Sequence, residues 1–225
     1  DRIRSRGLGD VYKRQQVDTL KSDANSYKKL GDYAKAENCI LKGLELKAND
    51  NVLKHELAKI YFKREKYAGS LELLLDLSNK IKKRQILFKD IAMCYYKMNK
   101  LEKALGAVQI SLSENSNNLS SLFVEGLIYR EQGNFSESIS SFKRLLELDT
   151  NNRDALYQLG KIYHQKGRYR EALESFDKVL EFRPRDNEVL KAKGISHDEL
   201  NEYKEASEAL KTVSYTHLRA HETEY

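Results

Sequence analysis

The sequence has few of the residues that stop helices, form disulfide frameworks or build a membrane span. Its 225 residues include one proline, two cysteines, two methionines and no tryptophan. No run of 18 apolar residues occurs, so no segment is expected to cross a membrane. Cys39 and Cys94 lie two repeats apart in the pattern described below, too distant for a disulfide, and both are expected to be free thiols.

Neither a strong excess of charge nor a catalytic motif is present. The chain has 40 basic and 34 acidic residues, and a net charge of +6 over this length does not favour a nucleic-acid partner. It contains no glycine-rich phosphate loop, paired-cysteine motif, His-Glu helix motif or nucleophile elbow, and His55, His164 and His197 are scattered. We therefore expect no catalytic residue, no cofactor and no metal site, and predict that the chain is not an enzyme.

The most regular stretch runs from Arg153 to Pro184 and has the pattern of two helices. Large or small apolar residues recur there at helical spacing, first at Leu156, Leu159, Gly160 and Tyr163, then at Tyr169, Ala172, Leu173 and Phe176. Gly167 between the two sets can adopt a positive φ and end the first helix, and Pro184 cannot continue the second. The stretch predicts an antiparallel helix pair whose apolar faces are too wide for one pair to bury alone.

The same pattern repeats every 34 residues. Four positions carry it through six copies: an aromatic ring at Tyr27, Tyr61, Tyr95, Tyr129, Tyr163 and His197; a small residue at Ala24, Ala58, Ala92, Gly126, Gly160 and Gly194; a second small residue at Ala36, Ser70, Ala104, Ser138, Ala172 and Ala206; and a larger apolar residue at Ile40, Leu74, Val108, Phe142, Phe176 and Leu210. The copies begin near residues 17, 51, 85, 119, 153 and 187. Small residues facing each other across a pair allow close helix packing.

This pattern resembles the tetratricopeptide repeat (TPR) family, over about residues 17–211. The resemblance implies an all-α, right-handed solenoid of about six tandem 34-residue helix-turn-helix repeats, the last one truncated. The tryptophan frequent in the family's first helix is absent. The closing proline occurs only at Pro184, so the other repeat junctions are expected to be less sharply fixed.

The repeat register predicts where helices and turns lie. Helices are expected near 17–29, 33–47, 51–64, 67–79, 85–97, 101–114, 119–131, 135–148, 153–165, 169–182, 187–199 and 203–211. The turns inside the pairs carry Gly31, Glu65, Asn99, Gly133, Gly167 and Asn201. Glycine and asparagine tolerate the left-handed conformation of a helix end, so the turn at Glu65 is expected to differ from the others or to be strained.

The two ends of the chain are expected to be adapter-derived rather than native. Residues 5–15 (SRGLGDVYKRQ) and 213–223 (VSYTHLRAHET) are translations of opposite strands of one short DNA sequence, which resembles a sequencing-library adapter. We assign 1–15 and 213–225 to the adapter and 16–212 to the solenoid, and expect a fragment of a longer gene. His217 and His221 have a zinc-compatible spacing, but their place in the adapter argues against a metal site.

A concave groove is the candidate binding surface implied by the resemblance. The family lines it with three residues from the first helix of each repeat, and the central repeats place apolar, aromatic and basic side chains there. The partner-binding residues predicted are Lys59, Phe62, Lys89, Met93, Tyr96, Phe123, Leu127, Arg130, Tyr157 and Lys161, with Phe62, Tyr96, Phe123 and Tyr157 as hot spots. In the competing interpretation these residues only cover neighbouring helices.

The predicted function is a non-catalytic scaffold that binds a peptide or partner domain in this groove. The alternative is an accessory region of a larger enzyme or signalling protein. The family's clamp for a C-terminal carboxylate is disfavoured, because Glu56, Ile86 and Asp90 occupy positions where it needs amide or basic groups. The basic residues Lys80, Lys82, Lys83 and Arg84 are expected to form a solvated turn rather than a phosphate-binding patch.

Overall fold

The structure is a computed structural model that describes residues 2–80 and 85–211. Within these ranges the regular secondary structure is α-helical and no strand occurs. Among the predictions above, those for Lys82, Lys83, Arg84, His217 and His221 fall outside the described residues. Lys80 is described, and its ammonium lies 2.6 Å from the carboxylate of Asp76.

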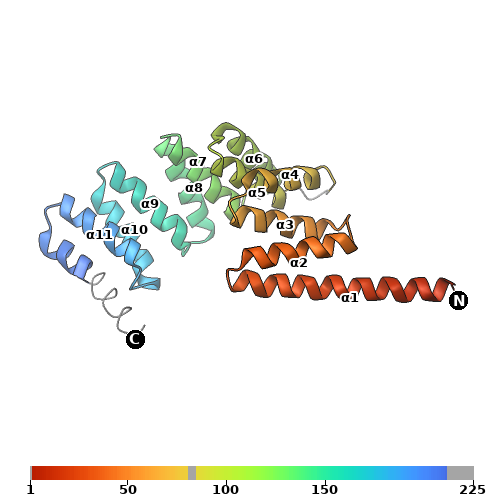
Figure 1. The fold of residues 1–225 in the computed structure, drawn as a ribbon. Helices are drawn as coiled ribbons and strands as arrows, with labels where there is room; N and C mark the ends of the chain where they lie inside the picture. The colour runs from red at the N-terminus through yellow and green to blue at the C-terminus, as the bar shows by residue number, and fades with distance from the viewer. Residues whose placement is uncertain (1, 81–84, 212–225) are drawn as a thin grey trace, which may run out of the picture. The chain divides into compact units, whose positions relative to one another are not determined.

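The helices form consecutive antiparallel pairs in two units (Figure 1). Unit 1, Asp1–Glu114, contains α1 (Arg2–Lys29), α2 (Tyr33–Leu46), α3 (Asn51–Lys63), α4 (Tyr67–Ser78), α5 (Gln85–Lys97) and α6 (Leu101–Glu114). Unit 2, Asn115–Tyr225, contains α7 (Leu119–Glu131), α8 (Phe135–Leu148), α9 (Arg153–Gln165), α10 (Tyr169–Phe182) and α11 (Asn187–Glu199), and residues 203–211 are also helical. In each unit every helix packs on the next in the chain. The all-α repeat architecture and its register are therefore confirmed.

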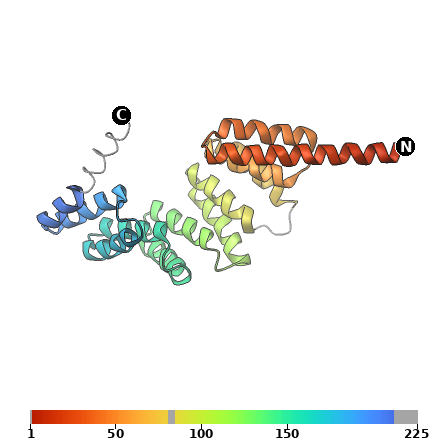
Figure 2. The ribbon, with the colours of Figure 1, turned by 90° about the horizontal axis from the view of Figure 1, so that it is seen from below.

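The predicted start of the first helix is wrong. We expected a helix from residue 17, whereas α1 begins at Arg2 and runs past the end of α2 (Figure 2). The physical reason is local: an isolated helix satisfies its own backbone hydrogen bonds, and this segment has no proline to end it. Burial nevertheless begins where the repeat begins, because Val11 and Tyr12 are 55% and 62% exposed and Val17 is 3% exposed.

All six turns inside the pairs share one hydrogen-bonded geometry. The residue after the turn donates its backbone N–H to the carbonyl of the repeat's ring residue, at 2.8 Å from Lys66 to Tyr61 and 2.9 Å from Arg168 to Tyr163. This is the Schellman arrangement, which needs a positive φ at the residue between. Glu65 adopts it with φ 59°, so of the two outcomes expected for this turn the strained one is correct.

The junctions between repeats are fixed more sharply than the single proline suggests. Asp50, Asn118, Asn152 and Asp186 each precede a first helix, and each side chain accepts hydrogen bonds from backbone N–H groups of the first turn. Such N-caps satisfy donors that have no partner inside the helix. The expectation of loosely fixed junctions is therefore corrected for those at Asp50, Asn118 and Asn152, because side-chain caps take the role assigned to proline.

The two helices of a pair approach closely at the small residues, as predicted from the repeat pattern. A Cβ added to Gly160 would lie 2.5 Å from Cε1 of Phe176, and one added to Gly126 would lie 2.7 Å from Cε1 of Phe142. In unit 1 the equivalent position is alanine, and the facing residue is aliphatic, as in the buried pair Ala58 and Leu74. In these repeats glycine accompanies phenylalanine and alanine accompanies an aliphatic side chain, which keeps the contact filled without overlap, whereas in the sixth repeat Gly194 faces Leu210.

Candidate functional site

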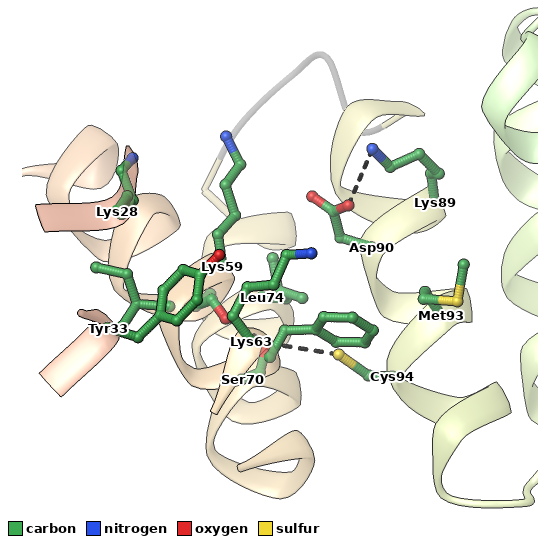
Figure 3. Close-up of a pocket in the computed structure, with 13 residues that line it drawn as sticks. Lys28, Tyr33, Lys59, Lys63, Ser70, Leu74, Lys89, Asp90, Met93 and Cys94 are labelled. Atoms are coloured by element: carbon green, nitrogen blue, oxygen red, sulfur yellow. Dashed lines mark hydrogen bonds and ion pairs between the residues drawn. The ribbon is translucent and has the colours of Figure 1, made fainter. Parts of the chain in front are cut away.

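A pocket of about 360 Å³ opens in unit 1 between α3 and α5 (Figure 3). Its interior is mainly apolar, with Phe62 from α3, Leu74 from α4 and Met93 from α5. Tyr33 of α2 adds an aromatic wall. The edge-on contact of Phe62 with Tyr67, with ring centroids 5.3 Å apart, holds the Phe62 ring in place.

The pocket exists because this repeat interface has smaller side chains than the equivalent interface in unit 2. Leu74 stands where unit 2 has Phe142, and Cys94 stands where it has Ile162. Phe142 and Ile162 are both fully buried and fill the interior. Smaller residues at two adjacent positions leave the space open, since protein interiors are otherwise packed without voids of this size.

The polar groups at the floor of the pocket are already satisfied. The Ser70 hydroxyl donates to the carbonyl of Ala58 at 2.7 Å, and the Cys94 thiol lies 3.4 Å from the Ser70 oxygen as a weak donor. Burial raises the pKa of the Cys94 thiol, so it stays protonated at neutral pH and is a poor nucleophile. The floor therefore offers an apolar ligand contact surface and no reactive group.

Lysines surround the mouth, and most of them are held by two carboxylates. Lys28 and Lys59 lie 2.5 Å and 3.0 Å from the carboxylate of Glu56. Asp90 lies 3.1 Å from Lys89 and accepts a hydrogen bond from Nε2 of His55 at 3.1 Å. Figure 3 shows these lysines, together with Lys63, drawn around the pocket from α1, α3 and α5.

The two carboxylates remain charged at neutral pH. Burial alone would raise the pKa of Glu56, but hydrogen bonds from Lys28 and Lys59 outweigh burial and lower it. Burial likewise acts to raise the pKa of Asp90, and the hydrogen bond with His55 and the charge of Lys89 lower it overall. The mouth is therefore a network of ion pairs rather than a set of free cations.

Lys63 differs from the other lysines of the mouth. It lies at the end of α3, is exposed, and lines the pocket. Within residues 2–80 and 85–211, no carboxylate lies within ion-pair distance of its ammonium group. The mouth has four lysines and two carboxylates, which gives it a formal excess of two positive charges. Among the described residues, Lys63 is the lysine of the mouth that pairs with no carboxylate.

Four of the ten predicted binding residues meet at this pocket: Lys59, Phe62, Lys89 and Met93. Tyr96 is half-buried in α5 and is not part of the lining. Five residues lie in unit 2, namely Phe123, Leu127, Arg130, Tyr157 and Lys161. Their role in binding remains a prediction.

In unit 2 the predicted residues contact their own repeat or, for Arg130, the next one. Phe123 packs on Phe142 with ring centroids 5.7 Å apart, and Leu127 is only 8% exposed. Arg130 hydrogen-bonds to Gln158 and pairs with Glu131 at 2.5 Å. Tyr157 packs on Phe176 at 6.1 Å and carries the Lys161 ammonium over its ring at 5.5 Å. These contacts bury part of each side chain, as the competing interpretation expects.

Sequence reasoning missed the residues that make the pocket deep. The repeat pattern places Leu74 and Ser70 in the repeat core, predicts Cys94 only as a free thiol, and does not include Lys63 among the groove positions. The signal was present in the repeats themselves, because Leu74 and Cys94 are smaller than their counterparts in unit 2. A comparison of side-chain volumes between repeats would have indicated the pocket.

A second hollow, of about 540 Å³, lies in unit 2 beside α10 and α11. Two basic residues of its lining are paired, Lys193 at 2.6 Å from Asp177 and Arg170 at 2.5 Å from Glu202, and the lining also contains Glu174, Glu205 and Glu208. This hollow is more polar than the first and has an excess of acidic residues. In the described part of the chain, no group of three or more histidine, cysteine, aspartate or glutamate side chains is arranged to hold a metal ion. No described helix is long and apolar enough to span a membrane.

Comparisons with known proteins agree with the repeat geometry. A family model described as TPR repeat matches residues 126–167, and models described as tetratricopeptide repeat match residues 24–50 and 154–186. The chain carries tetratricopeptide repeats. The TPR matches fall in both units, and no curated protein matches the sequence.

Solved TPR structures share the fold at low sequence identity. A TPR protein from Parabacteroides merdae has a TM-score of 0.69 at 19% identity, over 89% of this chain and 80% of that one. A thermophilic TPR protein from Thermus thermophilus has a TM-score of 0.69 at 20% identity, over 82% and 98%. YrrB, described as a TPR protein with an unusual peptide-binding site, has a TM-score of 0.56 at 24% identity, over 77% and 90%. At these identities the likeness shows the fold alone.

Proposed function

We propose that this TPR chain is a non-catalytic interaction scaffold that binds a peptide segment of a partner protein at the pocket of unit 1. The observation that carries the proposal is an apolar pocket between two repeats, open to solvent and surrounded by charged groups. Specific binding sites combine such an apolar interior with a few polar groups that fix orientation. An apolar side chain of the segment would fill the space between Phe62, Leu74 and Met93.

Two further observations support this function. The walls are well-anchored aromatic and aliphatic side chains, the kind that concentrate binding energy at interfaces. TPR proteins bind proteins or peptides, and YrrB, which shares the fold, is described as having a peptide-binding site. A catalytic role for the pocket has no support from its chemistry, since its buried thiol is protonated and its carboxylates are held in ion pairs.

The test uses a pocket-filled variant that the chain itself suggests. Ala58→Gly with Leu74→Phe reproduces in unit 1 the Gly126 and Phe142 pair of unit 2, where glycine makes room for the ring. The double variant should fold, because unit 2 already accommodates this pair at the same repeat positions. Circular dichroism and thermal unfolding would establish that the variant is folded.

Peptides would be selected from a random display library on the full chain and then measured against both proteins. We expect the selected peptides to bind the filled variant at least tenfold more weakly, because the anchor side chain has no space to enter. Equal affinity for both proteins would show that peptides bind elsewhere. Failure to select any peptide would contradict peptide binding as the function.

A further inference from the structure

We infer that the peptide bound at this pocket carries an acidic side chain beside its apolar anchor, and that Lys63 receives that carboxylate. This inference rests on the proposed function and adds the chemistry of the partner. It follows from how charge is distributed around the mouth. Each other lysine of the mouth already pairs with a carboxylate of the chain, whereas Lys63 has no such partner among the described residues.

The ion pairs at the mouth decide which lysine is available. Glu56 accepts from both Lys28 and Lys59, and Asp90 lies beside Lys89. A ligand carboxylate that approached Lys59 or Lys89 would also approach Glu56 or Asp90, and repulsion would offset its gain. At Lys63 an incoming carboxylate would meet an exposed ammonium. No ion pair among the described residues would have to break for it to bind there.

The ion pairs at the mouth also determine whether the pocket can bind a chain-terminal carboxylate or a side-chain carboxylate. Recognition of a chain-terminal carboxylate by several converging cations would need Lys28, Lys59 and Lys89 free, but Glu56 and Asp90 hold them. One available lysine fits one side-chain carboxylate, from aspartate or glutamate within the segment. Because Lys63 and the apolar interior line one pocket, the acidic residue must lie close to the anchor in the peptide.

Single charges at an interface rim contribute little to affinity and more to specificity and association rate. Replacing the peptide's acidic residue by its amide should therefore weaken binding to the native protein by about three- to tenfold at low salt, and less at high salt. The same replacement in the peptide should not weaken binding to the Lys63→Gln variant, because that variant no longer has the lysine that receives the carboxylate. Swapping both charges, with Lys63→Glu and a lysine in the peptide, should restore part of the affinity.

The experiment uses the library-selected peptides that depend on the open pocket, measured by fluorescence anisotropy against the full chain. Each peptide is made with its acidic residue as glutamate, glutamine and lysine, and with a free or amidated C-terminus. Lys103→Glu is the matched control. It makes the same charge change on an exposed residue of α6 in the same unit, away from the pocket lining.

The expected result is coupling between the peptide's acidic residue and Lys63, with no such coupling to Lys103 and no effect of C-terminal amidation. Equal coupling to both lysines would show a long-range charge effect and would overturn the assignment of Lys63. Loss of binding on amidation would show recognition of a chain terminus and would overturn the side-chain carboxylate. Pocket-dependent peptides with no acidic residue would overturn this inference while leaving the proposed function intact.

Discussion

Six equivalent residues in this chain hold the same left-handed backbone conformation, and only Glu65 among them is neither glycine nor asparagine. Its neighbours in the chain are tied down by one carboxylate. Glu37 of α2, 8% exposed, accepts from Arg64 and from Lys66, the latter at 3.0 Å. The Lys66 ammonium also lies 5.0 Å from the Tyr61 ring centroid. Strained backbone persists where surrounding contacts hold it, and Glu37 provides such contacts on both sides of Glu65.

Replacing Glu65 by glycine should stabilise unit 1. A left-handed conformation costs a residue with a Cβ about 1–2 kcal/mol, and the greater freedom of glycine in the unfolded chain offsets part of that gain. We expect a net stabilisation of about 1 kcal/mol. Glu65→Ala is the control, because it removes the same side chain and keeps the Cβ. Urea unfolding followed by circular dichroism would measure both, and equal effects of the two substitutions would contradict the strain.

Two glycines inside helices should respond in opposite ways to alanine. The added Cβ at Gly160 would meet the fully buried ring of Phe176 at 2.5 Å, whereas nothing lies within 4 Å of one at Gly106. Gly160→Ala should therefore destabilise the protein by about 1–3 kcal/mol through overpacking. Gly106→Ala should stabilise it by up to about 1 kcal/mol through helix propensity. If both substitutions shift the thermal midpoint in the same direction, the contact at Gly160 is not a close one.

Between elements, the pairing of small and large residues decides where the structure is filled and where it is open. Gly126 with Phe142 and Gly160 with Phe176 fill their helix pairs with an aromatic ring. Ala58 with Leu74 is smaller in total, and Cys94 in the next repeat does not compensate. The pocket of unit 1 is therefore a consequence of repeat-to-repeat variation in side-chain volume at these positions.

The network of ion pairs between α3 and α5 predicts an acid-sensitive unit. Because the pKa of Asp90 is lowered in the folded protein, its charge stabilises the fold fully above the ordinary carboxyl pKa of about 4. That stability is lost as the pH falls through the lowered folded-state pKa. Urea midpoints at pH 7, 5, 4 and 3 should fall less steeply below pH 5 for Asp90→Asn than for the native protein. If the urea midpoints of the native protein and of Asp90→Asn fall in parallel with pH, His55 and Lys89 do not stabilise the charge of Asp90.

Much of this architecture could be predicted from the sequence, because the repeat period fixes which residues face each other. The period placed eleven helix starts correctly, identified the positive-φ turns, and located the close contact at Gly160. It did not predict that α1 begins at Arg2, since helix formation without packing leaves no apolar periodicity. It did not predict the N-caps at Asp50 and its equivalents, because a capping residue precedes the helix and lies outside its apolar periodicity.

The candidate site was only partly predictable for a related reason. A groove defined by fixed repeat positions names Lys59, Phe62, Lys89 and Met93, which all line the pocket. Pocket depth depends instead on side-chain volumes at core positions such as Leu74 and Cys94, and on which lysines are already paired. Those are properties of contacts between repeats, and the sequence of one repeat does not contain them.

At the scale of the molecule, the described residues form a regular framework of helical repeats with an open apolar pocket in unit 1. Unit 2 is filled at the positions where unit 1 is open, and its predicted groove residues Phe123 and Tyr157 pack on rings of their own repeats. Unit 1 combines the open interior with a lysine that lacks a carboxylate partner among the described residues. We propose that binding takes place at this opening and not at the repeat surface in general.

The chain's two methionines allow that claim to be tested directly. Met93 lines the pocket, whereas Met98, one turn further along α5 and just past its end, does not. With ¹³C-methyl methionine labelling, the full chain gives two methyl signals, which Met93→Leu and Met98→Leu assign. Addition of a selected peptide should shift the Met93 signal and leave that of Met98 nearly unchanged. Saturating binding that leaves Met93 unshifted, or that shifts both signals equally, would contradict binding at the pocket.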